Sequence, residues 1–171
     1  LIAALFQDHQ RYLTDIIENI AIGNINDFEN ISRIEESAKQ VGIHNLIKSM
    51  PNGYKTKLGA VQQGGVDLSG GEWQKLAVAR LINSACLIKI LDEPTSAMDP
   101  IFEYSLYQDF NKIMKNTTTI SISHRLASCR NVDLIYVLKD GQIVECGNHK
   151  LLMDNKNLYY KMYSTQKEMY K

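Results

Sequence analysis

Two short apolar segments that each lead into chemically active side chains constrain the possible folds of this chain most. Residues 86–91 run directly into the adjacent acids Asp92 and Glu93, and residues 117–122 are closely followed by His124. Both segments carry β-branched residues and lack Gly and Pro, which predicts strands. Helical patterns surround them, and strands that alternate with helices are typical of an α/β sheet. Because such sheets bind ligands at the carboxyl ends of their strands, we expect these side chains at a functional edge.

The stretch before these strands is mostly helical. A short apolar strand is expected at residues 2–6, and helical signals then run from Thr14, an expected N-cap, to about Ile82. Turn-forming residues interrupt this stretch at Gly23-Asn24, Gly42, Pro51-Asn52-Gly53 and Gly64-Gly65. An amphipathic helix is marked by apolar residues at spacings of three and four, namely Ile31, Ile34, Ala38 and Val41.

After Ser84 the pattern changes to strands and shorter helices. Asp99-Pro100 predicts the start of a helix, whose buried stripe comprises Phe102, Leu106, Phe110 and Ile113. Asp140-Gly141 predicts a hairpin turn between a strand at residues 134–138 and Ile143-Val144. We therefore expect four parts: a strand and loop at 1–12, an inserted helical subdomain at 13–83, the rest of the sheet domain at 84–148, and C-terminal helices at 149–171.

Composition limits the possible functions. The 171 residues suit one domain or part of a larger one, and 19 basic residues balance 19 acidic ones, so there is no electrostatic footprint for nucleic acid. No apolar run approaches the ~18 residues needed to cross a bilayer, and residues 1–6 lack the features of a signal peptide. A membrane role is therefore expected only through a partner or another segment. Cys86, Cys129 and Cys146 lack metal-binding spacing and are expected to be reduced, cytosolic thiols.

A second motif precedes the strand at 86–91. Ser69, Gly70 and Gly71 stand directly before a predicted helix, where two glycines allow the backbone to approach an anion and the helix terminus supplies free amides. The apolar face of this helix comprises Trp73, Leu76, Ala77 and Leu81. The alternative is a glycine turn that only caps the helix.

The acids suit two different roles. Asp92 suits a magnesium ion held through water, and Glu93 suits general-base activation of an attacking water. The alternative is a pair of solvated acids at a strand end. His124 alone is more often structural than catalytic, and Gln7, which ends the first strand, is by itself only a polar loop residue.

Together these residues resemble the ATP-binding cassette family over essentially the whole chain. Residues 68–74 are similar to the family's signature motif, with Glu72 where glutamine is commonest, and residues 87–92 to its Walker B strand. Glu93 aligns with the catalytic glutamate, Gln7 with the Q-loop glutamine and His124 with the switch histidine. Residues 96–99, with Met98 in the usual leucine position and ending at Asp99, are similar to the D-loop. The resemblance implies an α/β, P-loop NTPase-like core, present in its C-terminal part, with an inserted α-helical subdomain.

Other segments resemble the exporter subfamily, and two features depart from the family. Residues 58–65 are similar to the exporter loop that touches the coupling helices of the membrane domain, and residues 123–127 and 140–147 are also exporter-like. No G-x-x-x-x-G-K-[ST] loop occurs; in the family this Walker A loop and the adenine-stacking aromatic precede the Q-loop. Lys89 stands where the Walker B strand is usually apolar or tyrosine, so we expect it to reach a strand edge or to pair with an acid.

The resemblance implies a motor domain that binds ATP and Mg²⁺ and hydrolyses ATP in the full-length protein, whereas the isolated chain is expected to be inactive. Asp92 and Gln7 would bind the metal ion. The catalytic residues would be Glu93, His124 and Gln7. The implied nucleotide-contacting set is Leu68, Ser69, Gly70, Gly71, Glu72 and Asp99. In the family two such domains pair head to tail, so Ser69, Gly70 and Gly71 would contact the γ-phosphate held by the partner.

The expected partners are a second nucleotide-binding domain and the transmembrane domain of an exporter, at the cytoplasmic face of a membrane. Two alternatives remain. One is a truncated, non-hydrolytic module that binds a full cassette. The other is a soluble member of the superfamily that acts on nucleic acid, which the neutral charge and the exporter-like loop at 58–65 disfavour.

Overall fold

The computed structural model describes residues 2–60, 64–95, 113–114 and 116–169, and its chain forms two compact units, residues 1–122 and 123–171. We refer to them as unit 1 and unit 2. The predicted D-loop with Asp99, and nearly all of the helix expected after Asp99-Pro100, lie outside the described residues. The boundaries expected after residues 12, 83 and 148 stay predictions.

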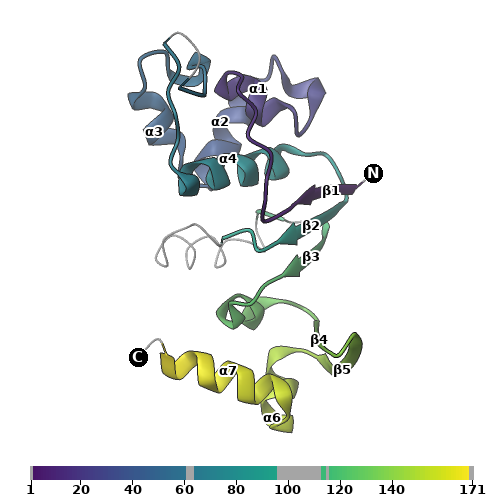
Figure 1. Ribbon diagram of the computed structural model, residues 1–171. Coiled ribbons are helices and arrows are strands. Elements are labelled where there is room, and N and C mark those ends of the chain that lie inside the picture. The colour runs from purple at the N-terminus through teal and green to yellow at the C-terminus, as the bar shows by residue number, and fades with distance from the viewer. Residues whose placement is uncertain (1, 61–63, 96–112, 115, 170–171) are drawn as a thin grey trace. The chain divides into compact units, whose positions relative to one another are not determined.

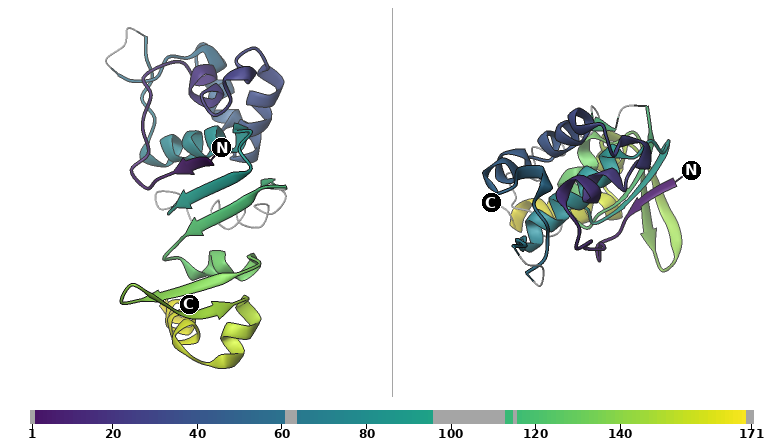
Figure 2. Two further views of the ribbon diagram at one scale, coloured as in Figure 1. Left: turned by 90° about the vertical axis from the view of Figure 1, so that its right-hand side faces the viewer. Right: turned by 90° about the horizontal axis from the view of Figure 1, so that it is seen from above.

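Unit 1 contains a three-stranded parallel sheet. Its strands β1 (Ile2–Leu5), β2 (Ile88–Asp92) and β3 (Thr118–Ile122) lie in the order β1-β2-β3. All three run in one direction, so their carboxyl ends share one edge (Figure 2). This parallel arrangement agrees with the α/β sheet expected from the sequence, although β2 begins two residues later than predicted. The first paired residue of β2 is Ile88, which pairs with Ile2 of β1 and with Thr118 of β3.

A helical subdomain is inserted between β1 and β2 (Figure 1). Its elements are α1 (Ile16–Ala21), the 3₁₀ turn η1 (Ile25–Asp27), α2 (Ile31–Gln40), α3 (His44–Ser49), the 3₁₀ turn η2 (Gly53–Lys55) and α4 (Gly70–Asn83). The central helix is α4, which packs against α1 and α2 and also contacts β1. It can do so because it buries side chains around most of its circumference, including Trp73, Leu76 and Val78.

Two local predictions in this subdomain need correction. The N-cap of α1 is Asp15 rather than Thr14: the Asp15 carboxylate accepts the Glu18 amide at 2.8 Å, while the Thr14 hydroxyl accepts the side-chain amide of Asn19 at 3.0 Å. Both residue types cap helices, and only the exact start of the helix decides between them. The stripe of α2 is buried at Ile34 and Ala38, but Ile31 is 40% exposed because it is the first residue of the helix.

Unit 2 is a hairpin with helices. Its elements are the 3₁₀ helix η3 (Leu126–Asn131), β4 (Ile135–Lys139), β5 (Gln142–Gly147), α6 (His149–Asn155) and α7 (Leu158–Met169). The strands β4 and β5 pair antiparallel through Asp140 and Gly141, whose φ angles of 50° and 76° confirm the predicted hairpin turn. Its small core comprises Ile135, Val137, Leu152 and Tyr159.

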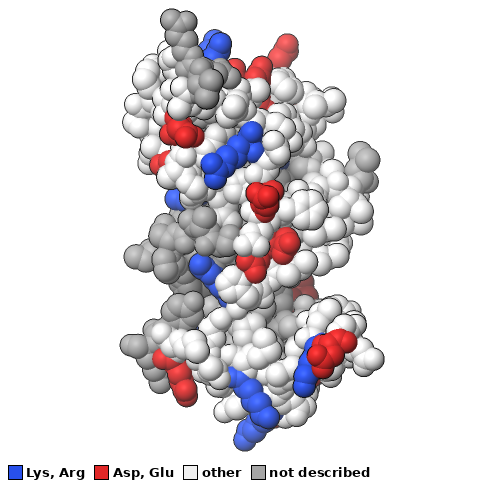
Figure 3. Space-filling view, viewed as in Figure 1, with Lys and Arg blue, Asp and Glu red and all other residues white. Residues whose placement is uncertain are grey.

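Two surface properties bear on function. Among the described residues, no helix has both the length and the apolar character required to cross a membrane. On the described part of the face in Figure 3, basic and acidic side chains are interspersed rather than gathered into one broad area of a single sign. The cysteines Cys86, Cys129 and Cys146 are free thiols, as expected.

Candidate functional site

The adjacent acids lie at the carboxyl edge of the sheet, as the sequence predicts. Asp92 is the last residue of β2 and pairs with Ile122 at the end of β3. Glu93 continues this ladder for one hydrogen bond, since its amide donates to the Ile122 carbonyl at 2.9 Å. Its φ angle is +48°, in the left-handed region. A residue in the left-handed region turns the chain out of the strand. The side chain of Glu93 therefore points in a different direction from the one it would have if the strand continued.

An open cavity of about 530 Å³ lies at this edge, lined by Phe6, Gln7, Asp8 and Asp92. Gln7 and Asp92, which are 85 positions apart in the sequence, therefore lie at one cavity because the parallel strands β1 and β2 end side by side. Asp8 lines the same cavity and was not foreseen; its position between Gln7 and His9 in a polar loop carries no signal that distinguishes it from solvated acids.

The donor atoms at this cavity fit magnesium. The amide of Gln7 and the carboxylates of Asp8 and Asp92 present oxygen, which Mg²⁺ prefers. Within the described ranges, no group of three His, Cys, Asp or Glu side chains is arranged to hold a metal ion by itself. In proteins Mg²⁺ usually keeps several waters and binds one or two protein carboxylates together with substrate phosphates.

The motif at 68–71 forms the beginning of α4. Ser69 is the N-cap, and a capping box joins it to Glu72: the Ser69 amide donates to Glu72 Oε2 at 2.7 Å, and the Glu72 amide donates to Ser69 Oγ at 3.4 Å. Glu72 at the position where the family commonly has glutamine thus closes the cap. Leu68 is buried and anchors the turn. The helix start is therefore fixed in place, and the capping alternative and the anion-binding hypothesis remain compatible.

The glycines leave the start of α4 open. Gly70 and Gly71 are the first two helical residues, and a Cβ placed on Gly70 would meet no atom within 4 Å. An open N-terminus of a 14-residue helix presents unpaired amides and the positive end of the helix dipole. This arrangement can approach an anion such as a phosphate.

A buried residue of α4 that sequence reasoning left without a role touches the edge of the sheet. The side-chain amide of Gln74 donates to the main-chain carbonyl of Glu93 at 3.2 Å. Gln74 is only 2% exposed, between the buried Trp73 and the half-buried Lys75. The signal that could have found it is a long polar side chain on a helix face otherwise made of apolar residues, since a buried amide requires partners.

His124 belongs to unit 2, where the main chain around it is held by Gln166 of α7. Gln166 Nε2 donates to the His124 carbonyl at 2.8 Å, and Gln166 Oε1 accepts the amide of Leu126 at 2.6 Å. The side chain of His124 is exposed. Its role beside Glu93 stays a prediction.

Lys89 departs from expectation. It neither reaches the solvent at a strand edge nor forms an ion pair among the described residues; it is 3% exposed, and its ammonium donates to the carbonyl of Ile82 near the end of α4 at 3.5 Å. Burial is the main cause that lowers the pKa of Lys89; Cys86 opposes this effect, and the positive charge of Arg33 adds a smaller lowering. Lys89 therefore belongs to the packing between β2 and α4.

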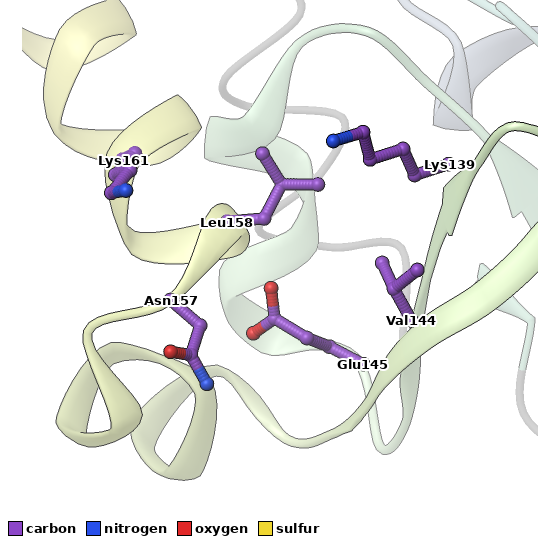
Figure 4. A pocket seen from close by; sticks show the side chains of 6 residues that line it. All are labelled: Lys139, Val144, Glu145, Asn157, Leu158 and Lys161. Atoms are coloured by element: carbon purple, nitrogen blue, oxygen red, sulfur yellow. The ribbon is translucent and has the colours of Figure 1, made fainter.

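A second cavity, of about 350 Å³, lies within unit 2 between β5 and the start of α7 (Figure 4). Glu145 projects toward Leu158 there, and its Oε1 accepts the amide of Tyr159 at 3.0 Å. The carboxylate thus caps the first turn of α7, which is a structural role.

Comparison with known proteins agrees with this geometry. The family model described as "ABC transporter" matches residues 2–96. The chain is 42% identical over 165 residues to ABC transporter B family member 4 of Dictyostelium discoideum, covering 96% of this chain and 21% of that protein. It is 40% identical over 163 residues to the ATP-dependent lipid A-core flippase of Psychrobacter cryohalolentis, covering 95% and 27%. The chain thus spans between 21% and 27% of the length of these relatives.

The fold also matches that of a solved protein. The structure of a bacterial Atm1-family ABC exporter with ATP bound aligns with a TM-score of 0.84 at 33% identity, over 96% of this chain and 28% of that one. The expected α/β core with an inserted helical subdomain is therefore confirmed. Since the family model also spans more than half of the 171 residues, the chain belongs to the ABC transporter family.

Proposed function

We propose that this chain is the later part of the ATP-hydrolysing nucleotide-binding domain of an exporter, which drives a substrate across a membrane. The observation that carries the proposal is the carboxyl edge of the sheet, where Gln7 and Asp92 line one cavity and Glu93 follows directly. The exporter that the chain resembles in fold was solved with ATP bound, and the two relatives described above are named as a B-family transporter and a lipid A-core flippase.

The residues at this edge would have different roles in ATP hydrolysis. Asp92 and Gln7 would hold Mg²⁺, which would supply charge stabilisation to the phosphates. Glu93 would orient a water molecule and accept its proton as the water oxygen bonds to the γ-phosphorus and the bond from that phosphorus to the leaving ADP breaks. His124 would contact and stabilise the γ-phosphate of the nucleotide bound by the same subunit. These roles follow the family resemblance, and the oxygen-rich cavity supports the metal assignment.

The open start of α4 supports a composite site. Ser69, Gly70 and Gly71 would approach the γ-phosphate bound by a second nucleotide-binding domain, in a head-to-tail dimer, with Leu68 and Glu72 holding the turn and Asp99 on the D-loop completing the contact. The space around Gly70 is what such an approach requires. The membrane domain of the exporter would be the other partner, and this domain would then lie at the cytoplasmic face of the membrane. By itself the chain would not hydrolyse ATP, because it has no Walker A loop.

The test is Glu93→Gln in the full-length protein that contains this chain. The amide keeps the volume but cannot accept the proton, so turnover should fall by roughly 10²-fold or more, while ATP binding persists. Glu168→Gln, on the exposed end of α7, is the matched control and should retain parental turnover. ATP hydrolysis by Glu93→Gln at near the parental rate would contradict the assignment of the base.

A further inference from the structure

The main chain of Glu93 is held in an unfavourable conformation. Its φ angle of +48° lies in the left-handed region, which costs a residue with a Cβ on the order of 1 kcal/mol or more. Such a conformation persists only where surrounding contacts enforce it. Here two hydrogen bonds hold the main chain of the residue. The Glu93 amide donates to the Ile122 carbonyl at 2.9 Å, and Gln74 Nε2 donates to the Glu93 carbonyl at 3.2 Å.

These two hydrogen bonds come from different parts of unit 1. The bond to Ile122 belongs to the sheet, because it continues the ladder between β2 and β3. The bond from Gln74 belongs to α4, the helix that begins at Ser69 and Gly70. Gln74 lies one turn beyond that start and is 2% exposed, so its side chain has little freedom to turn elsewhere.

We infer that Gln74 is a positioning residue for Glu93: through its hydrogen bond it holds the catalytic carboxylate in its working direction and ties that direction to the position of α4. This inference rests on the proposed function, since it assigns to Gln74 an effect on the base of ATP hydrolysis. When the bond is intact, Glu93 keeps the left-handed main chain that turns its carboxylate out of the strand. When α4 shifts relative to the sheet, the bond lengthens and Glu93 can relax toward the extended region.

The hydrogen bond from Gln74 to Glu93 also connects the signature motif at the start of α4 with the catalytic base. Gly70 and Gln74 lie four residues apart on one rigid helix, so a phosphate that moves the start of α4 also moves the donor that holds Glu93. The base is thereby aligned by contact of the helix with the partner's nucleotide. A buried glutamine that merely fills space would have no such effect on the chemical step.

The test replaces Gln74 with Met in the full-length protein. Methionine keeps the length and helix propensity of glutamine but cannot donate. We expect kcat for ATP hydrolysis to fall between about 10-fold and 100-fold, as for a misplaced catalytic group, while KM for ATP stays within about threefold. Gln40→Met on α2 is the matched control and should keep parental kinetics, because Gln40 Nε2 donates to Glu36 Oε1 of the same helix at 3.4 Å rather than to the sheet edge. If Gln74→Met does not fold, Gln74→Leu, a shorter apolar side chain that also cannot donate, should show the same loss.

A double mutant separates positioning from a general structural effect. With Glu93→Gln already present there is no base to align, so adding Gln74→Met should lower the residual rate by less than about twofold. A full additional loss in that background, or parental kcat in Gln74→Met alone, overturns the positioning role and leaves the proposed function intact. Parental turnover in Glu93→Gln overturns the proposed function and this inference with it.

Discussion

At the scale of single residues, unit 2 contains a histidine whose protonation opposes folding. His149 Nδ1 lies 2.8 Å from the Tyr159 hydroxyl, and its ring packs 4.8 Å from the ring of Tyr163. Burial lowers the pKa of His149, and the positive charge of Arg130 lowers it further. The folded unit therefore favours the neutral imidazole.

The sign of the resulting pH dependence is fixed. In the unfolded chain the pKa of a histidine is about 6.5, and the folded pKa of His149 lies below that value. As the pH falls below about 6.5, the unfolded state binds more protons than the folded state, so unit 2 should lose stability. His149→Gln can keep a hydrogen bond to Tyr159 but cannot titrate, so it should flatten the decline in melting temperature between about pH 7.5 and 5.5. An unchanged decline in this variant would assign the effect to other groups.

Sequence reasoning reached some site residues and missed others for a physical reason. The meeting of Gln7 and Asp92 was foreseeable because the carboxyl ends of parallel strands share one edge: Asp92 is the last residue of β2, and Gln7 follows two residues after the end of β1. The contact of Gln74 with Glu93 was not, because it depends on how α4 packs on the sheet rather than on spacing. The left-handed main chain of Glu93 likewise has no local signal, since Glu rarely adopts it.

At the scale of elements, the segments with strong local signals were predicted and their ends were less certain. The hairpin between β4 and β5 follows from Asp140-Gly141, whose residue types tolerate positive φ. The start of β2 was placed too early because the apolar residue Leu87 continues the pattern, yet it is exposed and lies before the first paired residue. Pattern alone does not show where a neighbouring strand begins.

The junction between α1 and α4 is predicted to depend on one glycine. A Cβ added to Gly23, just after α1, would lie 2.0 Å from the main-chain oxygen of Arg80 on α4, and main chain cannot yield as a side chain can. Gly23→Ala should therefore destabilise unit 1 by about 2–3 kcal/mol or more. Urea unfolding followed by the fluorescence of Trp73, which is the only tryptophan and is buried in unit 1, would measure the loss.

The matched control is the same glycine-to-alanine change at Gly70, the first residue of α4. A Cβ on Gly70 meets no atom within 4 Å, and alanine suits a helix better than glycine by roughly 0.5–1 kcal/mol. Gly70→Ala should therefore leave the stability of unit 1 unchanged or slightly raised. Equal effects of the two substitutions would show that the approach of α1 to α4 is not what requires Gly23.

At the scale of the whole molecule, the proposed function assigns the chain one half of each of two sites. On that proposal, the acids at the sheet edge would serve a nucleotide of the same subunit, whereas the open start of α4 would serve the nucleotide of a partner. The fold class was predictable because short segments of sequence indicate each strand and helix, and the order of these elements indicates an α/β sheet. The proposed division of roles between two subunits rests only on the family resemblance, since a composite site leaves no pattern within one chain.

Gly70→Asp should separate the two sites. The space at Gly70 admits the larger side chain, and an acid in the first turn suits the helix dipole, so unit 1 should fold normally. Binding of ATP to a single full-length subunit should stay nearly unchanged. A carboxylate there would oppose the partner's γ-phosphate, so ATP-driven dimerisation and hydrolysis should both collapse. Equilibrium ATP binding and gel filtration with ATP would measure the two effects, and loss of ATP binding by the single subunit would contradict a composite site.

Mixing this variant with Glu93→Gln gives the sharper prediction. Each variant alone should be nearly inactive, because both of its sites carry a defect. In a mixed dimer, one site combines the intact Glu93 of the first subunit with the intact Gly70 of the second, while the other site collects both defects. Hydrolysis should therefore reappear on mixing, in proportion to the fraction of mixed dimers, if closure on one sound site suffices for turnover. If each subunit instead used its own α4 for its own nucleotide, every site in the mixture would keep one defect and no activity would return.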